Sequence, residues 1–170
     1  MMKSSGFTLI ELLVVVIIMG VLTALALPQY RRAMDRSKAA EAMQMLPAFY
    51  EARERWVIEH QCTWSSGSIT SCEEGTFSAG KLDIESKGEV SDTDNTTVKT
   101  PNFVYNLVNK GTSSLNQACV SATPRWGANR NLTSAVIWYR GDKFSCNGNS
   151  DACDILNVTP DGDRYRQGCI

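Results

Sequence analysis

Apolar residues are concentrated in one uninterrupted segment near the start of the chain. Residues 7–27 read FTLIELLVVVIIMGVLTALAL, and Glu11 is the only charged residue among them. As an α-helix this segment would be about 31 Å long, close to the hydrocarbon thickness of a bilayer. We therefore predict a membrane-spanning helix over residues 7–28. The alternative is the buried helix of a soluble domain, but few domains of this size could surround so many apolar residues.

After Pro28 the apolar pattern changes from continuous to periodic. Apolar residues recur every three or four positions up to His60, and no glycine interrupts them. This spacing predicts an amphipathic helix over residues 29–60 whose apolar stripe covers a sheet, with a kink at Pro47 and a solvated histidine at its end. The predicted stripe comprises Tyr30, Ala33, Met34, Ala39, Ala42, Met43, Leu46, Phe49, Tyr50, Trp56 and Val57. The opposite, solvent-facing side is predicted to carry Glu41, Glu51, Arg53, Glu54 and Glu59.

Residues 61–170 are predicted to form a globular head. The first part, residues 61–100, is rich in Ser, Thr, Gly and Asp and is interpreted as loop. Strands are predicted over residues 103–109, 118–121, 134–140 and 143–146, with a hairpin turn between the last two and a turn-rich tail from residue 147. A helix followed by antiparallel strands is an α+β arrangement, with the long helix packed on a small sheet.

The head contains six cysteines, which are Cys62, Cys72, Cys119, Cys146, Cys153 and Cys169. An even number in an exported domain predicts up to three disulfides, and the sequence does not choose among the 15 pairings. Zinc binding is the competing use of cysteine. The chain lacks a C-x2-C pair and its one histidine is remote, so we expect no metal centre of this kind.

Charge and composition exclude several functions. Lys and Arg total 17 and Asp and Glu total 18, so no global positive field exists to hold nucleic acid. No Ser/His/Asp constellation or phosphate-binding glycine loop indicates an enzyme. Oxygen ligands at Asn147, Asn149 and Asp151, with Asp161 and Asp163 further on, match a calcium loop only in part, and turn formation is the simpler interpretation. We expect no cofactor, with calcium in the C-terminal loop as the alternative.

Three fates are open to the apolar segment: a cleaved secretory signal, a permanent anchor or an assembly stem. Residues 24–26 form an A-x-A pattern and Lys3 precedes the segment, as in a secretory signal. However, the segment is longer than an ordinary signal core. An acidic residue near a helix centre costs about 2.5–3.5 kcal/mol on insertion, and less near an end, so Glu11 indicates a function with a specific partner.

The first residues carry a family resemblance. Residues 1–12, MMKSSGFTLIEL, resemble the leader and cleavage motif of type IV pilins and type II secretion pseudopilins. Gly20, Pro28 and Tyr30 also stand where type IVa pilins have a glycine, a helix-loosening proline and a tyrosine. The resemblance implies that residues 1–6 are a leader, that prepilin peptidase cleaves between Gly6 and Phe7, and that Phe7 is then N-methylated.

Cleavage at this position would leave an ammonium group four residues from Glu11. The resemblance implies that Glu11 pairs with the Phe7 ammonium of an adjacent subunit, whereas the spacing would equally permit a contact within one chain. A third interpretation is an acid that only stabilises the helix N-terminus. The resemblance further implies flexibility at Gly20 and Pro28, and at least one disulfide among the last four cysteines.

By resemblance, the chain is a structural subunit of a type IV pilus, major or minor, assembled as a homo-oligomeric filament. A type II secretion pseudopilin is the alternative, although major pseudopilins commonly use calcium where this chain has cysteines. An anchored or secreted enzyme is a third option without supporting residues. The expected partners are prepilin peptidase, an inner-membrane assembly platform and, before assembly, membrane lipid.

The expected orientation is a single pass through the bacterial inner membrane, with a cytoplasmic leader and a periplasmic head that later reaches the cell surface or a periplasmic pseudopilus. Arg31, Arg32, Arg36 and Lys38 oppose this orientation, because positive residues usually stay in the cytoplasm. The cysteines and the leader favour it, and we give them more weight.

Overall fold

The computed structural model describes residues 7–65, 68–73, 75–84, 88–91, 95–108, 119–127, 132–148 and 150–158. The chain forms two compact units, Met1–Asp35 and Arg36–Ile170. Helix α1 (Leu9–Glu59) contributes residues to both units.

The first unit contains the apolar part of α1. Its large apolar side chains are exposed, from Leu9 at 82% to Leu27 at 46%. The helix continues through Pro28, so this proline does not end it. A proline inside a helix removes one backbone hydrogen bond at a cost of about 3 kcal/mol, but good helix formers on both sides keep the chain helical.

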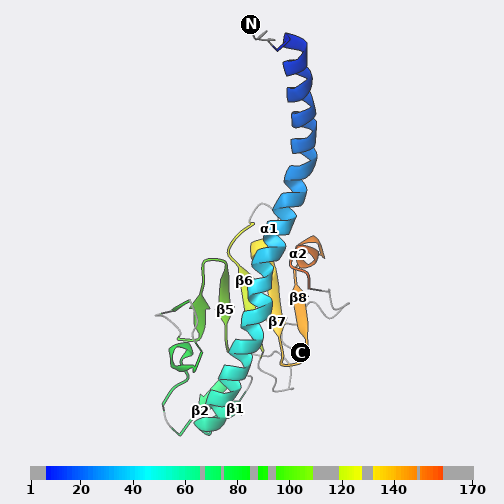
Figure 1. The fold of residues 1–170 in the computed structure, drawn as a ribbon. Coiled ribbons are helices and arrows are strands. Elements are labelled where there is room, and N and C mark those ends of the chain that lie inside the picture. The colour runs from blue at the N-terminus through cyan, green and yellow to red at the C-terminus, as the bar shows by residue number, and fades with distance from the viewer. Residues whose placement is uncertain are drawn as a thin grey trace. The chain divides into compact units, whose positions relative to one another are not determined.

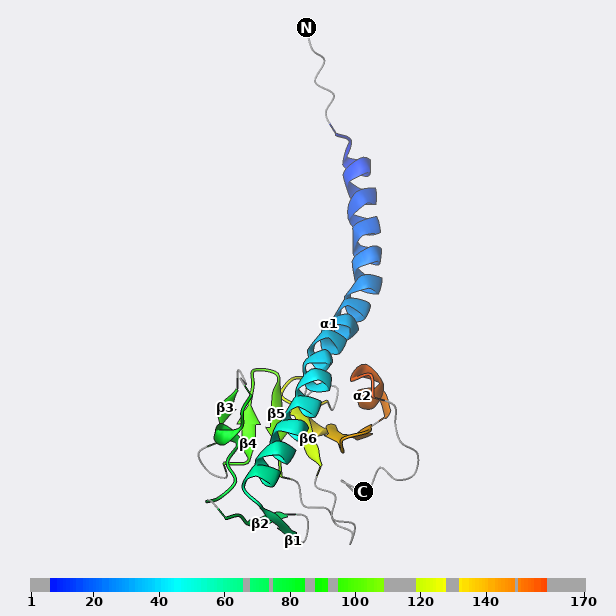
Figure 2. The same cartoon turned by 60° about the horizontal axis from the view of Figure 1, so that its bottom comes forward.

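The second unit contains an antiparallel sheet. Within the described residues its strand order is β3-β4-β5-β6-β7-β8, so each strand pairs with the next one along the chain (Figures 1 and 2). The strands are β3 (Glu89–Val90), β4 (Thr97–Lys99), β5 (Phe103–Asn106), β6 (Val120–Pro124), β7 (Val136–Tyr139) and β8 (Phe144–Asn147). Strands β1 (Thr63–Ser65) and β2 (Ser68–Ser71) form a separate hairpin after α1. The α+β prediction is confirmed.

The predicted turn between the last two strands is also confirmed. Tyr139 pairs with Phe144, and the Arg140 amide donates to the Lys143 carbonyl oxygen at 3.3 Å. Gly141 has φ +94° in this turn, and a Cβ there would lie 2.8 Å from Cε1 of Tyr50. Both the backbone angle and the close approach of α1 therefore require glycine.

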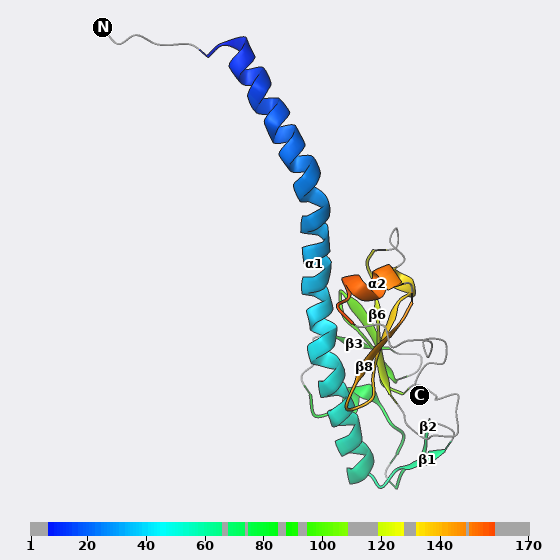
Figure 3. The same cartoon turned by 90° about the vertical axis from the view of Figure 1, so that its right-hand side faces the viewer.

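The second half of α1 covers one face of this sheet (Figure 3). Its predicted stripe is confirmed from residue 39 onward, where Ala39, Ala42, Leu46, Phe49, Trp56 and Val57 are buried. Phe49 packs on Tyr105 of β5, with ring centroids 5.1 Å apart. Among the residues assigned to the solvent face, Arg53 is instead fully buried, because it follows Phe49 by one helical turn.

Two predicted irregular regions contain regular structure. Residues 61–100 hold β1 to β4 and a 3-10 helix, η1 (Ala79–Lys81), while the predicted turn-rich tail contains α2 (Ser150–Ile155). These elements are two to six residues long, so they show no clear alternation, and the strands β1 and β2 consist largely of Ser and Thr. A second 3-10 helix, η3 (Leu132–Ser134), precedes β7.

The predicted bounds of the other strands lie close to the bounds in the structure. Strand β6 extends to Pro124, beyond the predicted end at residue 121, because Thr123 and Pro124 still pair with β5. Strand β5 ends at Asn106, and Leu107 and Val108 follow it outside the strand. Residues 109 and 118, which the predicted strands included, lie outside the described residues.

Candidate functional site

The exposed apolar stem, residues 7–27, is the first candidate site. Within the described chain, α1 is the one helix long and apolar enough to cross a membrane, and none of the side chains in its apolar window is buried. Burying a large aliphatic side chain is favourable by about 1.5–3 kcal/mol, so this surface requires lipid or neighbouring helices around it. Met1 to Gly6, including the predicted cleavage residue Gly6, lie outside the described residues.

Glu11 forms a reciprocal cap with Thr8 at the start of the stem. Its Oε2 accepts hydrogen bonds from the Thr8 amide at 2.8 Å and the Thr8 hydroxyl at 2.7 Å. The Glu11 amide in turn donates to the Thr8 hydroxyl at 3.3 Å. This is a capping box, which satisfies the first free amides of the helix. Among the described residues, the second carboxylate oxygen accepts no hydrogen bond, so it is accessible to a cation.

Gly20 has no packing role within a single chain. A Cβ at this position would have no heavy atom within 4 Å. Glycine nevertheless costs a helix interior about 1 kcal/mol relative to alanine. The structure of the free chain therefore gives no reason for a glycine here, whereas close approach by another helix would.

Disulfides fasten two ends of the head. Cys62–Cys72 joins the residue before β1 to the residue after β2, and Cys146–Cys153 joins β8 to α2. The second bond lies among the last four cysteines, as the resemblance implies. Cys119 is also disulfide-bonded, and Cys169 lies outside the described residues.

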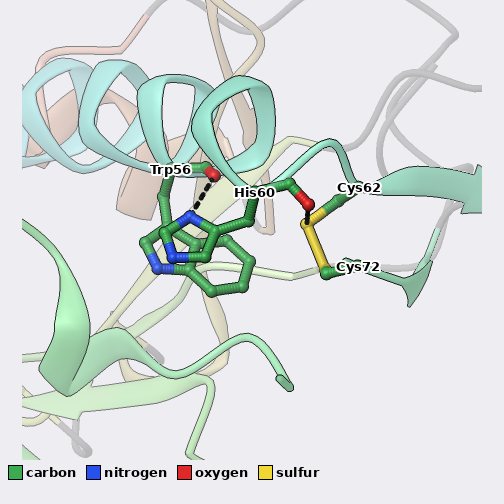
Figure 4. The surroundings of a disulfide bond; sticks show 4 residues. All are labelled: Trp56, His60, Cys62 and Cys72. Carbon is green, nitrogen blue, oxygen red and sulfur yellow. Dashed lines mark hydrogen bonds between the residues drawn. A yellow bond between two sulfur atoms is a disulfide. The ribbon is translucent and has the colours of Figure 1, made fainter. Parts of the chain in front are cut away.

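His60 lies beside the first disulfide and is not fully solvated. Its ring stacks on Trp56 with centroids 4.1 Å apart, and Nδ1 lies 2.9 Å from the Trp56 carbonyl oxygen (Figure 4). The Cys62 disulfide sulfur lies 3.9 Å from the His60 carbonyl oxygen. These contacts hold the histidine at the C-terminal end of α1 and do not form a catalytic arrangement.

The partial calcium pattern is divided by the fold. Asn147 is the last residue of β8, and Asp151 lies in the first turn of α2. Asn149, Asp161 and Asp163 lie outside the described residues. In the part of the chain that the structure describes, no three His, Cys, Asp or Glu residues gather in a metal-binding cluster.

Sequence reasoning missed two polar residues that join α1 to the sheet. Arg53 donates from Nη1 to the Leu107 carbonyl oxygen at 3.0 Å and from Nη2 to Glu54 Oε1 at 2.7 Å. Its guanidinium lies 4.7 Å from the Tyr50 ring centroid. Burial lowers the pKa of Arg53, and the adjacent Glu54 carboxylate opposes this effect. The sequence feature that could have indicated its burial is its position four residues after Phe49, on the same face of the helix.

Glu41 is the second missed residue, since it was assigned to the solvent face. It is half-buried, and its carboxylate accepts hydrogen bonds from the Thr100 hydroxyl at 2.7 Å, the Asn102 amide at 2.7 Å and the Tyr105 hydroxyl at 3.3 Å. Burial, followed by the Glu41 charge, raises the pKa of Tyr105 far above its ordinary value. Both missed residues have structural roles, so the stem remains the candidate functional site.

The comparisons with known proteins point to the same segment. Residues 1–27 match the prokaryotic N-terminal methylation motif. The chain is 35% identical over 97 residues to a fimbrial protein of Pseudomonas aeruginosa, covering 56% of this chain and 63% of that protein. It is 35% identical over 101 residues to the type IV major fimbrial protein FimA of Dichelobacter nodosus, covering 54% and 63%. The chain therefore spans slightly less than two thirds of these relatives.

A longer alignment joins the chain to prepilin peptidase-dependent protein D of Escherichia coli (strain K12). It has 29% identity over 151 residues and covers 88% of each protein. No solved structure matches the chain. The methylation motif and these fimbrial relatives make the chain similar to type IV pilins, and the exposed stem with its single acid and the helix-on-sheet head agree with that similarity.

Proposed function

We propose that this protein is a structural subunit of a type IV pilus. The observation that carries the proposal is the exposed apolar stem whose single charge, Glu11, lies one turn from Phe7. The relatives named as fimbrial proteins support a pilus in preference to a secretion pseudopilus. The subunit has a structural role, and no enzymatic step is needed from its own residues.

Processing creates the assembly-competent form. Prepilin peptidase cleaves between Gly6 and Phe7, and the new amino group of Phe7 is methylated and keeps its positive charge. Such an α-amino group has an ordinary pKa of about 7.7–8.0, so it is mostly cationic at neutral pH. The match of the methylation motif to residues 1–27 supports this step.

Assembly then depends on Glu11. An unpaired carboxylate among packed apolar stems is costly, and the Phe7 ammonium of an adjacent subunit removes that cost and sets the axial register. In the free chain one oxygen of Glu11 is occupied by Thr8. The other oxygen accepts an additional donor without breaking the helix cap. Gly20 allows close approach of a neighbouring stem, and Pro28 supplies a weak point in the helix.

Before assembly, the subunit resides in the inner membrane as a single-pass protein with its head in the periplasm. The apolar stem exchanges lipid for neighbouring stems when it enters the filament, so one surface serves both states. The disulfides of the head fit an oxidising compartment. The head needs neither calcium nor another cofactor to fold.

The test is deletion of the coding gene followed by complementation. Cells complemented with the wild-type chain should display surface filaments that contain this subunit, as seen by electron microscopy and mass spectrometry. Restoration of protein export without surface filaments, with the chain retained in the periplasm, would contradict the pilus and favour a secretion pseudopilus.

A further inference from the structure

Two exposed arginines, Arg31 and Arg32, follow closely after the apolar stem. A helix rises 1.5 Å per residue, so Arg31 and Arg32 lie about 6 and 7.5 Å along α1 from Leu27, the last residue of the stem. The headgroup layers add about 5–8 Å to each side of a 30 Å hydrocarbon core. Because α1 continues through Pro28, this axial spacing is fixed by the helix itself.

The two arginines are available for an external partner. Both are exposed, and neither takes part in an ion pair or side-chain hydrogen bond among the described residues. Other arginines of the chain are engaged: Arg53 pairs with Glu54, and Arg55 with Asp83.

The neighbouring side chains also fit an interfacial position. Tyr30 is 64% exposed, and tyrosine is enriched where a membrane meets water. Arg36 and Lys38 follow in the second compact unit, so Arg31 and Arg32 are the cations that share a unit with the end of the stem.

We propose that Arg31 and Arg32 bind the phosphate groups of anionic phospholipids in the leaflet that faces the head. A guanidinium presents a planar set of donors that matches phosphate oxygens, and its long stem reaches along the interface. This contact holds the unassembled stem at a fixed depth. It also explains why positive residues follow the stem on the exported side, against the usual bias. The inference rests on the proposed function, because it requires the stem to reside in a bilayer.

The experiment uses the full mature chain, beginning at Phe7, in vesicles of equal parts phosphatidylcholine and phosphatidylglycerol. Spin-labelled forms of each lipid report how strongly each associates with the protein. The double variant Arg31→Gln/Arg32→Gln is compared with Lys99→Gln/Lys143→Gln, which loses the same charge at two exposed positions of the head. Each arginine is expected to raise the association of phosphatidylglycerol, relative to that of phosphatidylcholine, by up to about fivefold.

The wild type and the lysine variant should prefer phosphatidylglycerol, and the arginine variant should lose most of that preference. High salt should weaken the preference, whereas millimolar inorganic phosphate should not compete with it. Equal association of both lipids with the wild type, or an unchanged preference in the arginine variant, would overturn the proposal. The proposal would also be overturned if binding of a DNA fragment depended on these arginines while the lipid preference did not. Carbonate extraction separates a failure of this proposal from a failure of the proposed function. A chain that carbonate releases from the vesicles has not inserted, and this result refutes the membrane stem itself.

Discussion

At the scale of single residues, Glu11 has two roles that a conservative substitution separates. Its carboxylate caps the helix through Thr8, and we propose that it also supplies the negative charge that pairs with a neighbouring subunit. Glutamine occupies the same position in capping boxes but carries no charge. The substitution Glu11→Gln therefore tests the charge with the cap retained.

We expect Glu11→Gln and Glu11→Ala to insert into the membrane normally and to reduce filament yield at least tenfold. Removing the acid lowers the cost of insertion and leaves the Phe7 ammonium without a partner. Sheared filaments and membrane-bound subunit are measured by immunoblot, with Glu51→Gln on the exposed part of α1 as control. Normal assembly by Glu11→Gln would contradict the ion pair.

Arg53 permits a prediction about stability. The substitution Arg53→Ala should lower the free energy of unfolding by about 2–3 kcal/mol, because it removes buried packing and leaves the Leu107 carbonyl oxygen without this donor. Arg53→Met keeps most of the volume and should cost less. Denaturant titration of the detergent-solubilised protein measures both, and equal stability of all three proteins would show that the buried arginine contributes little.

At the scale of elements, the end of α1 is set by backbone geometry and not by a glycine. The Cys62 amide donates to the Val57 carbonyl oxygen at 2.9 Å, and the Gln61 amide donates to that of Ile58 at 3.2 Å. This is a Schellman motif, in which the residue after the helix takes a left-handed conformation. Gln61 occupies that position with φ 47°, an angle that glycine adopts more easily.

The substitution Gln61→Gly should therefore stabilise the head by about 0.5–1 kcal/mol. It also removes an exposed hydrogen bond from Gln61 to Glu73, which contributes little. Gln61→Ala is the matched control, because it loses that hydrogen bond without relieving the backbone. The midpoint of denaturant unfolding reports the difference, and a glycine variant less stable than the alanine variant would show that the angle is not strained.

The elements also show where sequence reasoning succeeds. Long periodic or apolar segments predicted α1 and its buried stripe, and the turn residues Gly141 and Asp142 between two predicted strands predicted the β7–β8 hairpin. Strands β1 to β4 were missed because segments of two to four residues gain their structure from pairing, not from local preference, and β1 and β2 consist largely of Ser and Thr. The same limit applies to Glu41, whose partners lie 59 to 64 residues away in the chain.

The proposed functional residues follow more directly from the sequence than the short strands of the fold do. Glu11 is identified by being the one charge in an apolar segment, and Gly6 and Phe7 by the motif around them. The cap between Thr8 and Glu11 was not predicted, although Thr-x-x-Glu is a recognisable signal. The disulfide pairing depended on which strands and helices the fold brings together, which cysteine spacing alone does not specify.

At the scale of the whole molecule, we propose that disulfides and not calcium stabilise the head. Reduction should lower the melting temperature by several degrees or more, because each cross-link that closes a short loop contributes about 2–4 kcal/mol in the chain-entropy model. A chelator should change it by less than about one degree. Differential scanning calorimetry with each treatment is the measurement. A large shift with chelator would restore the calcium alternative at Asn147 and Asp151.

We propose that this chain is processed and assembled through its N-terminal stem. The most direct test is mass spectrometry of the subunit in filaments sheared from cells, including its first residue. We predict a mature chain that begins with N-methylated Phe7 and contains Glu11 in its stem. A mature chain that begins at Leu27, or surface filaments that lack this protein, would contradict the claim.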